Sequence, residues 1–392
     1  MRLLLVIDQF DAANNGTTIS ALRFAGALSE RGHEVRVACT WKPGAPGEDV
    51  QPFRHYLFDP LRIPGFNGVI ARQGAALAKP DDAKLREALE WADVTHFMLP
   101  FWLCRRGKRI ADELGVPSTA AFHVQPQNIT YSLGLGQWRF VNNALYAAFR
   151  PYFNRFEHLH IPSPYLAGEL NSRGYRAQLH VISNGVDPQF VYRRDAKRPQ
   201  WADRIVITTV GRHSKEKRHD LLIEAVRRSR HASQIQLVIA GYGPLTEKLE
   251  KLGASLPHRP VLGFFPQAQL RDLLAESDLY VHPADAEIEG ISCIEAFASG
   301  LVPVISDSPA SAAGQFALDS RSLFRAGDPS SLAKAIDDWI EDDAERNRMG
   351  QVYAEAGRAY GLEQSVDAFE AMLTTAMGVT RKTLPEAVLS VR

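Results

Sequence analysis

Residues 287–305 read EIEGISCIEAFASGLVPVI, and this stretch is the most informative about the fold of the chain. Glycine is common at helix ends, so a helix is expected to begin near Gly290 and to stop at Gly300. Residues 302–305 form an apolar run with the composition of a strand that is buried on both faces. A helix that leads directly into such a strand is typical of a parallel α/β sheet.

The same stretch contains two carboxylates, Glu287 and Glu295. Glu287 is expected on a loop, and Glu295 near the first turn of the helix, beside its electropositive end. A carboxylate can accept two hydrogen bonds and can therefore hold a vicinal diol, and free amides at a helix start suit a phosphate. Together these groups suit a nucleotide sugar. The alternative is that both acidic residues only complement the helix dipole.

The composition is that of an ordinary globular protein, with 45% hydrophobic and 23% charged residues. Basic and acidic residues both number 45, so nothing indicates a nucleic-acid partner. Cys39, Cys104 and Cys293 have neither metal-ligand nor disulfide spacing, and a cytoplasmic location is expected. Asp285 and Glu287 alone make a poor metal site, so no metal is expected. No apolar stretch reaches membrane-spanning length, and any membrane contact would be peripheral.

Strand-like and helix-like segments alternate along the chain, and the alternation restarts in its second half. A chain of 392 residues is expected to form two domains. The expected fold class is α/β, with two doubly wound Rossmann-like domains facing a central cleft. The expected parts are an N-terminal domain over 1–185, a C-terminal domain over 186–360, a helix over 361–378 and a loose tail over 379–392. Residues 41–80 are expected to be loop with short helices. The expected strands are 3–7, 35–39, 94–97, 119–122, 205–210, 235–240, 261–263, 279–281 and 302–305.

Two loops in the second half follow expected strands, at the sheet edge where ligands bind in such folds. In the first loop, Arg212 offers a planar fork of donors and Lys217 a compact charge, which together suit a diphosphate. The alternative is a solvated basic loop. In the second loop, Gly241 and Gly243 allow close approach of a ligand, although a turn that only starts the next helix explains them equally well.

The first half supplies two weaker candidates. Gly16 follows the first expected strand, where its backbone could approach a phosphate, but an ordinary turn is the simpler explanation. His123 follows directly after the expected strand 119–122, again on the expected cleft side. A lone histidine is more often structural than functional.

Taken together and in their order along the chain, these motifs resemble those of the retaining GT-B glycosyltransferases of family 4, the glycosyl transferases group 1. The resemblance covers nearly the whole chain and is strongest over residues 181–306. It rests on Glu287-x7-Glu295, Gly211-Arg212 with Lys217, AGYGP at 240–244 and VISNGVD at 181–187.

The resemblance implies a role for each candidate residue. Arg212 and Lys217 would bind the donor diphosphate, Glu287 the sugar hydroxyls and Glu295 the ribose hydroxyls. Helix 361–378 would cross back to the N-terminal domain. The implied catalytic residues are His123, Arg212, Lys217 and Glu287. The implied donor-binding residues are Gly16, Arg212, Lys217, Gly241, Gly243, Glu287, Gly290, Ile291, Ser292 and Glu295.

Three positions depart from the family pattern. The family often has Phe where Glu289 stands, and it usually has Gly where Arg218 follows the lysine. The paired glycines of its first loop appear here as Asn15-Gly16. Glu289 and Arg218 are candidate markers of a subgroup.

Residues 122–131, FHVQPQNITY, and 287–296, EIEGISCIEA, are most similar to bacterial diacylglycerol glucosyltransferases. A lipid acceptor would require a membrane-facing surface, and the aromatic-rich stretch 138–156 is one candidate. A basic cluster adds to it and suits an anionic membrane; its members are Arg105, Arg106, Lys108 and Arg109. The alternative, which we favour, is that 138–156 forms an amphipathic helix packed inside the N-terminal domain.

The expected function is retaining transfer of a hexose, with glucose from UDP-glucose foremost, to an acceptor hydroxyl without a metal or cofactor. The acceptor would be a membrane lipid such as diacylglycerol, or else a soluble small molecule or saccharide. The rival functions are a nucleotide-sugar isomerase on the same fold and a non-catalytic nucleotide-binding or membrane-associated module. The protein would be cytoplasmic, with peripheral contact to the inner face of an anionic plasma membrane.

Overall fold

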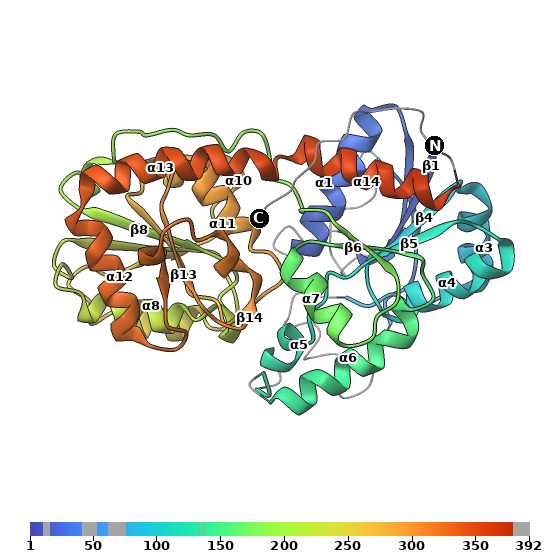
Figure 1. Ribbon diagram of the computed structural model, residues 1–392, viewed down its shortest axis with the longest axis horizontal. Coiled ribbons are helices and arrows are strands. Elements are labelled where there is room, and N and C mark those ends of the chain that lie inside the picture. The colour runs from blue at the N-terminus through green and yellow to red at the C-terminus, as the bar shows by residue number, and fades with distance from the viewer. Residues whose placement is uncertain (11–15, 41–52, 62–75, 133, 137, 379–392) are drawn as a thin grey trace.

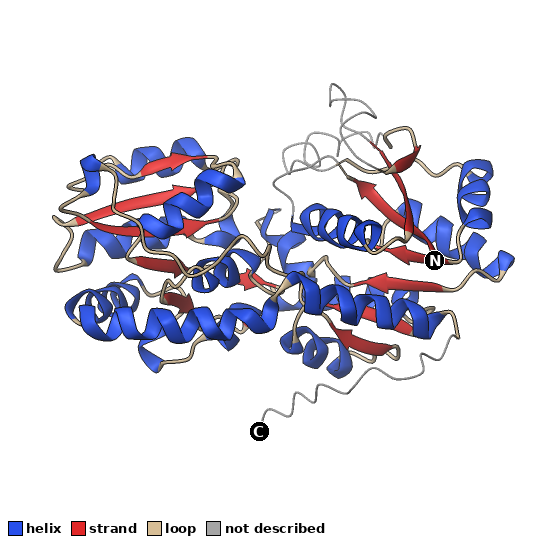
Figure 2. Cartoon of the chain, turned by 90° about the horizontal axis from the view of Figure 1, so that it is seen from above, coloured by secondary structure: helices blue, strands red, loops and turns tan. Residues whose placement is uncertain are grey.

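The computed structural model describes residues 1–10, 16–40, 53–61, 76–132, 134–136 and 138–378. It has two halves, each built on a parallel sheet with helices on both faces (Figures 1 and 2). The strand order in the first half is β3-β2-β1-β4-β5-β6-β7. Its strands are β1 Arg2–Gln9, β2 Glu34–Thr40, β3 Arg54–Leu57, β4 Val94–Phe97, β5 Ser118–Ala121, β6 His158–Ile161 and β7 Gln178–Val181. Its helices are α1 Gly16–Glu30, α3 Asp82–Trp91, α4 Trp102–Leu114, α5 Pro126–Ser132, α6 Arg139–Phe153 and α7 Pro164–Ser172.

The second half has the strand order β10-β9-β8-β11-β13-β15, and a short ribbon of β12 and β14 lies beside it. Its strands are β8 Ile205–Val210, β9 Ile235–Ala240, β10 Val261–Gly263, β11 Leu279–His282, β12 Ala286–Glu287, β13 Pro303–Ser306, β14 Ala310–Ser311 and β15 Leu323–Phe324. Its helices are α8 His219–Arg228, α9 Thr246–Gly253, α10 Gln267–Glu276, α11 Ile291–Ala298, α12 Pro329–Glu341 and α13 Asp343–Gly357. Short 3₁₀ turns include η3 Lys215–Lys217 and η4 Ala312–Phe316.

The unbroken apolar run of β1 reflects burial of both faces of the sheet. Leu3 and Leu5 point into a core that also contains residues of α1 and of the last helix, α14 Leu362–Ala376. Leu4 and Val6 point into the opposite core, which α3 and α4 cover. Because successive side chains of a strand face opposite sides, a strand covered on both sides has no polar face, and its run of apolar residues is readily recognised in the sequence.

Helix starts follow local capping chemistry. The Asp81 side chain accepts from the Lys84 amide at the start of α3, and Ser163 does the same for α7. At α12, Asp328 accepts from two amides, and Pro329 occupies the first helical position, where its missing N–H carries no penalty.

The last helix, α14, leaves the second half and packs on the first. Figure 1 shows α13 and α14 in line across the top of both halves. A parallel bridge between Val186 and Gly361 marks the crossing. Beyond it, Phe369 packs against Phe24 of α1 with ring centroids 4.6 Å apart, and Arg31 pairs with Asp367 and Glu370 of α14. The core of the first half therefore includes residues of α14.

All nine expected strands are present, with ends that differ by at most two residues. The expectation of loop and short helices over 41–80 is wrong for β3, a parallel edge strand whose Arg36↔Arg54 register pairs it with β2. An edge strand is half exposed and lacks an apolar run, so its pairing depends on a neighbour that local composition does not reveal. Residues 41–52, 62–75 and the expected tail 379–392 lie outside the described residues.

Candidate active site

The candidate residues of the second half cluster where its strand order reverses. β8 pairs with β9 on one side and with β11 on the other. In such sheets the loops after the two central strands diverge, and ligands bind between them. Residues 211–217 follow β8, and residues 283–290 follow β11. Chain topology therefore brings together the Arg212–Lys217 loop and the Glu287–Gly290 loop that the sequence singled out.

Gly241 and Gly243 have a structural reason for being glycine. Gly241 has φ of +149°, and a Cβ there would lie 2.0 Å from the Gly211 carbonyl oxygen. At Gly243 a Cβ would lie 2.6 Å from the carbonyl oxygen of His213. No side chain fits at these distances, so both glycines let the loop after β9 pack on the loop after β8. That packing holds Arg212 at the carboxyl edge of the sheet.

Lys217 and Glu287 form a partly buried ion pair between the two loops. Burial alone would raise the pKa of the Glu287 carboxyl, but the Lys217 ammonium and His282 more than offset it and hold this pKa at about 2. Burial likewise lowers the pKa of Lys217, and the Glu287 carboxylate outweighs that effect, so this pKa is raised. Both side chains therefore stay charged at neutral pH. The pair presents a fixed cation and a fixed hydrogen-bond acceptor side by side.

Two buried side chains of β11 support this pair from behind. The His282 Nε2 atom lies 3.5 Å from Glu287 Oε2, and its Nδ1 atom lies 3.3 Å from the Tyr280 hydroxyl. The Tyr280 hydroxyl donates to Ser292 Oγ at 3.1 Å, and Ser292 Oγ donates to the Val210 carbonyl at 3.1 Å. Polar contacts thus run from Glu287 to the first turn of α11, and the contact between His282 and Glu287, at 3.5 Å, is the longest of them. The sequence analysis did not identify Tyr280 or His282, because both read as ordinary residues of a buried strand.

Glu295 lies inside α11 and is paired across the two halves. Its Oε1 atom accepts from Arg23 Nη2 of α1 at 2.6 Å, and Arg23 Nη1 also donates to the Gly185 carbonyl at 2.5 Å. Burial raises the pKa of the Glu295 carboxyl, and Arg23 opposes that rise. One oxygen of the expected ribose acceptor is therefore engaged by a residue that the sequence analysis missed. Arg23 gave no sequence signal, because it is one charged residue on an amphipathic helix.

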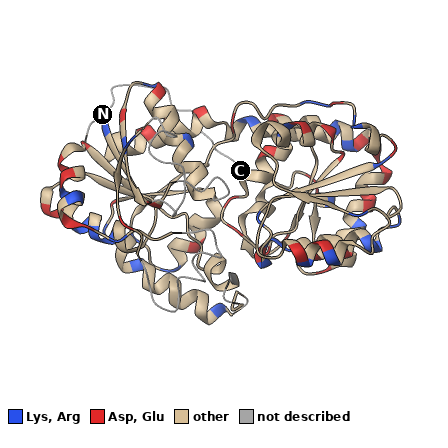
Figure 3. Ribbon diagram, turned by 180° about the vertical axis from the view of Figure 1, so that it is seen from behind, with Lys and Arg blue, Asp and Glu red and all other residues tan. Residues whose placement is uncertain are grey.

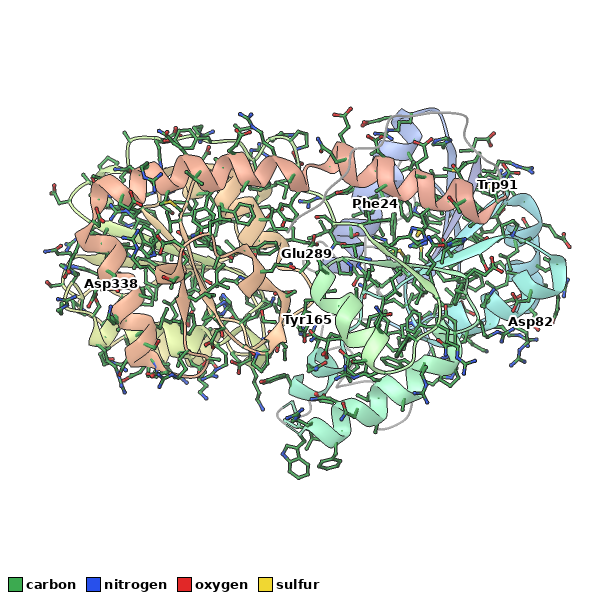
Figure 4. The ribbon with its side chains drawn as sticks, viewed as in Figure 1. Phe24, Asp82, Trp91, Tyr165, Glu289 and Asp338 are labelled. Atoms are coloured by element: carbon green, nitrogen blue, oxygen red, sulfur yellow. The ribbon has the colours of Figure 1, made fainter. Side chains whose placement is uncertain are left out.

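Glu289, the first departure from the family pattern, is buried at the junction of the two halves. Figure 4 labels it there, between the two sheets. Its carboxyl accepts from the Asn184 amide at 3.1 Å and 3.3 Å and also from the Asn184 side chain. Burial raises the pKa of Glu289 to about 7, although its hydrogen bonds lower it. Glu289 is therefore hydrogen-bonded to Asn184, in the segment that connects the two halves, and not to the loop that carries Arg212 and Lys217.

Gly290 begins α11 with φ of +103°, a conformation that favours glycine. A Cβ there would lie 3.5 Å from Glu287 Cγ, so Gly290 and Glu287 are neighbours. Ile291 and Ser292 form the first turn of the helix. The amide-rich helix start therefore lies next to the Lys217–Glu287 pair, where an anion would meet favourable dipoles.

The N-terminal candidates lie in the other half. Gly16 begins α1, the helix that carries Arg23. His123 is 5% exposed, and its ring packs on His160 with centroids 4.9 Å apart. Burial, and then His160, lower the pKa of His123, so the ring is neutral at neutral pH. Two residues later, Gln125 Nε2 donates to the Ala310 carbonyl of β14 at 2.9 Å, so the segment after β5 contacts the second half directly.

Within the described ranges, no group of three or more His, Cys, Asp or Glu residues has the geometry to hold a metal ion. The two carboxylates that could be read as a metal pair each contact a cation. Asp285 pairs with Arg218 at 3.0 Å, and Glu287 pairs with Lys217.

The structure corrects the expected basic cluster. Lys108 is buried and pairs with Asp112 at 2.6 Å, and Arg106 pairs with Asp82. Figure 3 shows acidic and basic residues intermingled on this side of the chain. The Arg105–Arg109 region is therefore not an open basic cluster, because acidic neighbours on the fold neutralise part of it.

The favoured alternative for 138–156 is correct for most of the stretch. Five of its aromatic residues are buried in the core beside α6, and they are Tyr146, Phe149, Tyr152, Phe153 and Phe156. Trp138 and Phe140 at the start of α6 are 53% and 66% exposed, with ring centroids 5.4 Å apart. None of the described helices is long and apolar enough to cross a membrane.

Comparison with known proteins matches both halves of the chain. The model for Glycosyltransferase Family 4 matches residues 14–190, and the model for Glycosyl transferases group 1 matches residues 193–355. A GDP-mannose-dependent alpha-mannosyltransferase of Mycolicibacterium smegmatis is 30% identical over 315 residues, which are 78% of this chain and 79% of that protein. The chain is a family 4 glycosyltransferase. This result confirms the family that the motifs predicted.

Two further similarities extend the comparison. This glycosyltransferase is 24% identical to the alpha-monoglucosyldiacylglycerol synthase of Acholeplasma laidlawii, over 78% of this chain and 80% of that protein. Its fold matches Anabaena HepE, solved in complex with UDP and glucose, with a TM-score of 0.74, 17% identity, and coverage of 96% and 100%. The fold is GT-B, as the motifs predicted.

Proposed function

We propose that this glycosyltransferase transfers a hexose from a UDP-hexose, foremost UDP-glucose, to an acceptor hydroxyl with retention at the anomeric carbon. The observation that carries the proposal is the partly buried Lys217–Glu287 pair beside the start of α11. It combines a cation and helix amides for a diphosphate with a fixed carboxylate for sugar hydroxyls.

Each donor-site residue has a proposed task. Arg212 and Lys217 stabilise the negative charge that grows on the departing diphosphate. Burial lowers the pKa of Arg212, and a half-buried guanidinium gains most from an anionic partner. Glu287 accepts from donor-sugar hydroxyls, and Glu295 accepts from the ribose, through the oxygen that Arg23 does not occupy or by exchange with Arg23. Backbone amides of Gly290, Ile291 and Ser292 face the sugar and phosphate, and Gly16, Gly241 and Gly243 give the donor close access to the backbone.

The proposed chemistry needs no protein nucleophile. The acceptor oxygen bonds to the anomeric carbon on the face that the diphosphate leaves, and the bond from that carbon to the phosphate oxygen breaks. The acceptor proton passes to the departing diphosphate. His123, held neutral by burial, would lie near the sugar. Because Asp285 and Glu287 are already paired with cations, we propose that charge on the diphosphate is neutralised by Arg212 and Lys217 without a metal.

A membrane lipid such as diacylglycerol is the acceptor that we propose. The Trp138–Phe140 pair at the exposed start of α6 is suited to the interface between lipid and water, and Arg139 lies between them in the sequence. The A. laidlawii relative is named for a diacylglycerol product, which supports the same class of acceptor. A soluble small molecule or saccharide is the alternative.

GDP-mannose is the second candidate donor. It is supported by the M. smegmatis relative, whose name states that dependence. The tasks proposed above concern the diphosphate, the ribose and the sugar, and none of them distinguishes one base from another. A donor panel therefore has to include both guanine and uracil nucleotides.

A mass-spectrometric screen tests the proposal. Purified protein is incubated with UDP-glucose, UDP-galactose, UDP-N-acetylglucosamine or GDP-mannose, each with diacylglycerol vesicles or with a panel of soluble polyols. We expect a glycolipid from UDP-glucose, with an α-linkage by NMR, and the same rate in EDTA. Donor turnover without any glycosylated product would contradict the transferase reaction, and full loss in EDTA with rescue by Mg²⁺ or Mn²⁺ would contradict the metal-free chemistry.

Vesicle sedimentation tests the lipid acceptor separately. Replacing both Trp138 and Phe140 by Ala should weaken binding to anionic vesicles and slow lipid glycosylation, with donor hydrolysis unchanged. Phe264→Ala is the matched control, because Phe264 is 59% exposed in the second half, away from the proposed surface. Equal vesicle binding by the wild type and the double variant would contradict the proposed membrane contact.

A further inference from the structure

Arg218 is the only non-glycine residue in the described parts of the chain with a positive φ. Its φ and ψ are 51° and 35°, a left-handed conformation in which side chains are disfavoured. Glycine would adopt this conformation without strain. A side chain kept at such a position suggests that the guanidinium has a task.

The Arg218 guanidinium contacts Asp285, which follows β11 and precedes Glu287 by two residues. Arg218 Nη1 donates to Asp285 Oδ2 at 3.0 Å, and the two side chains are 22% and 11% exposed. The Asp285 amide also donates to the Glu216 carbonyl at 2.8 Å. Asp285 is therefore held from the loop after β8 by both a side chain and a backbone group. A second bond from Arg218 Nε to Asp220 is longer, at 3.3 Å.

The same Asp285 oxygen also binds the other half of the protein. The Tyr131 hydroxyl of α5 donates to Asp285 Oδ2 at 3.2 Å. Burial, and then the Asp285 charge, raise the pKa of Tyr131, so the hydroxyl keeps its proton and remains a donor. α5 packs directly on η3 and on β12, the elements that carry Lys217 and Glu287. Arg218, Asp285 and Tyr131 thus form a bridge from the loop of one half to a helix of the other.

We propose that Arg218 is a positioning residue for transfer, acting through Asp285 to hold Tyr131 and α5 against the Lys217–Glu287 pair. α5 begins three residues after His123 and belongs to the half opposite the donor loops, so its placement sets how closely an acceptor can approach the donor sugar. The inference rests on the proposed function only for the roles of Lys217 and Glu287. The bridge itself is a contact between halves, and it can be measured without any substrate.

The simpler explanation is that Arg218 only neutralises Asp285 and Asp220 and caps α8 locally. The two explanations differ for Arg218→Gly. Glycine removes the backbone strain, so thermal stability should be maintained or raised, whereas the bridge is lost. The positioning role requires that transfer slows even though the fold is no less stable. If the role of Arg218 is purely local, the rate of transfer should stay at the wild-type value as long as the thermal stability does.

The experiment compares Arg218→Gly, Tyr131→Phe and the double variant with the wild type. Each single change should lower kcat for transfer by roughly tenfold, the effect expected when one charge-assisted hydrogen bond that positions the reacting groups is lost, with the Kd for UDP within twofold. The double variant should lose no more than the worse single variant, because both changes break one bridge. Tyr165→Phe is the matched control: its hydroxyl also crosses between the halves, to the Pro309 carbonyl at 3.1 Å, but contacts neither donor loop.

Hydrogen exchange of the substrate-free protein separates this inference from the proposed function. Arg218→Gly and Tyr131→Phe should both speed amide exchange in α5 relative to the wild type and to Tyr165→Phe. Unchanged exchange in α5, or additive effects of the two changes on kcat, would overturn the bridge. Loss of UDP affinity in step with kcat would overturn the positioning role, since Arg218 would then act on donor binding. Faster exchange in α5 in a protein that transfers no hexose would leave the bridge supported and the proposed function refuted.

Discussion

Replacing Glu289 by Gln should make this glycosyltransferase more stable at alkaline pH while leaving its stability at acidic pH nearly unchanged. Glu289 is 1% exposed, and burial raises its pKa from an ordinary 4.5 to about 7. Between these values the folded protein holds a proton that the unfolded chain has lost, so this group makes stability fall as pH rises. The stabilisation is fully present below pH 4.5 and is lost once the pH passes about 7.

The magnitude follows from the same two values. The difference between 4.5 and about 7 corresponds to about 3 kcal/mol of unfolding free energy, taken as an upper bound. Glutamine has nearly the same shape, and its single side-chain oxygen can replace Oε2, which accepts from the Asn184 amide at 3.1 Å and from the Asn184 side chain. Only the longer bond to Oε1, at 3.3 Å, is lost. The variant therefore avoids the cost of a buried carboxylate without leaving a cavity.

Urea unfolding at pH 5 and at pH 8 measures the effect. We expect similar midpoints at pH 5 and a higher midpoint for Glu289→Gln at pH 8. Asp8, whose pKa burial also raises to about 7, is present in both proteins and cancels in the comparison. Glu355→Gln is the control, because Glu355 lies on the surface with a side chain that is 67% exposed. If the difference between variant and wild type is the same at both pH values, Glu289 does not carry the shifted ionisation and the reasoning is wrong.

Three further predictions concern the donor site. Lys217→Ala should lower kcat by about 10²–10³-fold, the usual effect of removing one hydrogen-bond donor to the charge that develops on the leaving group. Steady-state assays measure this, and wild-type kinetics in the variant would contradict the role of Lys217 at the diphosphate. Calorimetry should show that Glu295→Ala weakens UDP itself, whereas Glu287→Ala leaves UDP binding nearly intact and impairs only the intact sugar donor; equal losses for both ligands would reject that division. Tyr280→Phe should lower kcat by about tenfold, because it breaks the hydrogen bond to Ser292. The control Tyr353→Phe loses an equally buried hydroxyl, bonded to Ser322 at 3.0 Å, and should lower only the stability of the protein. Equal losses of kcat in both variants would count against the support role of β11.

Much of the architecture was predictable because its signals are local. β1, β8, β9 and β13 are covered by helices on both faces, so each appears as an apolar run that needs no knowledge of its neighbours. The edge strand β3 was missed because it has one pairing partner and no such run. Trp138 illustrates the same limit for a surface: its stretch has an aromatic composition throughout, but only packing decides which rings are exposed.

The sequence by itself determined the family, the alternation of strands and helices, and the loops at the ends of β8 and β11. These depend on residues close together in the chain. Only the tertiary structure decided the partner of each charged group. Glu295 pairs with Arg23 from 272 positions away, and Tyr131 reaches Asp285 across 154 positions. A carboxylate is held by whichever cation or donor the fold brings within about 3 Å, and no local pattern specifies that neighbour.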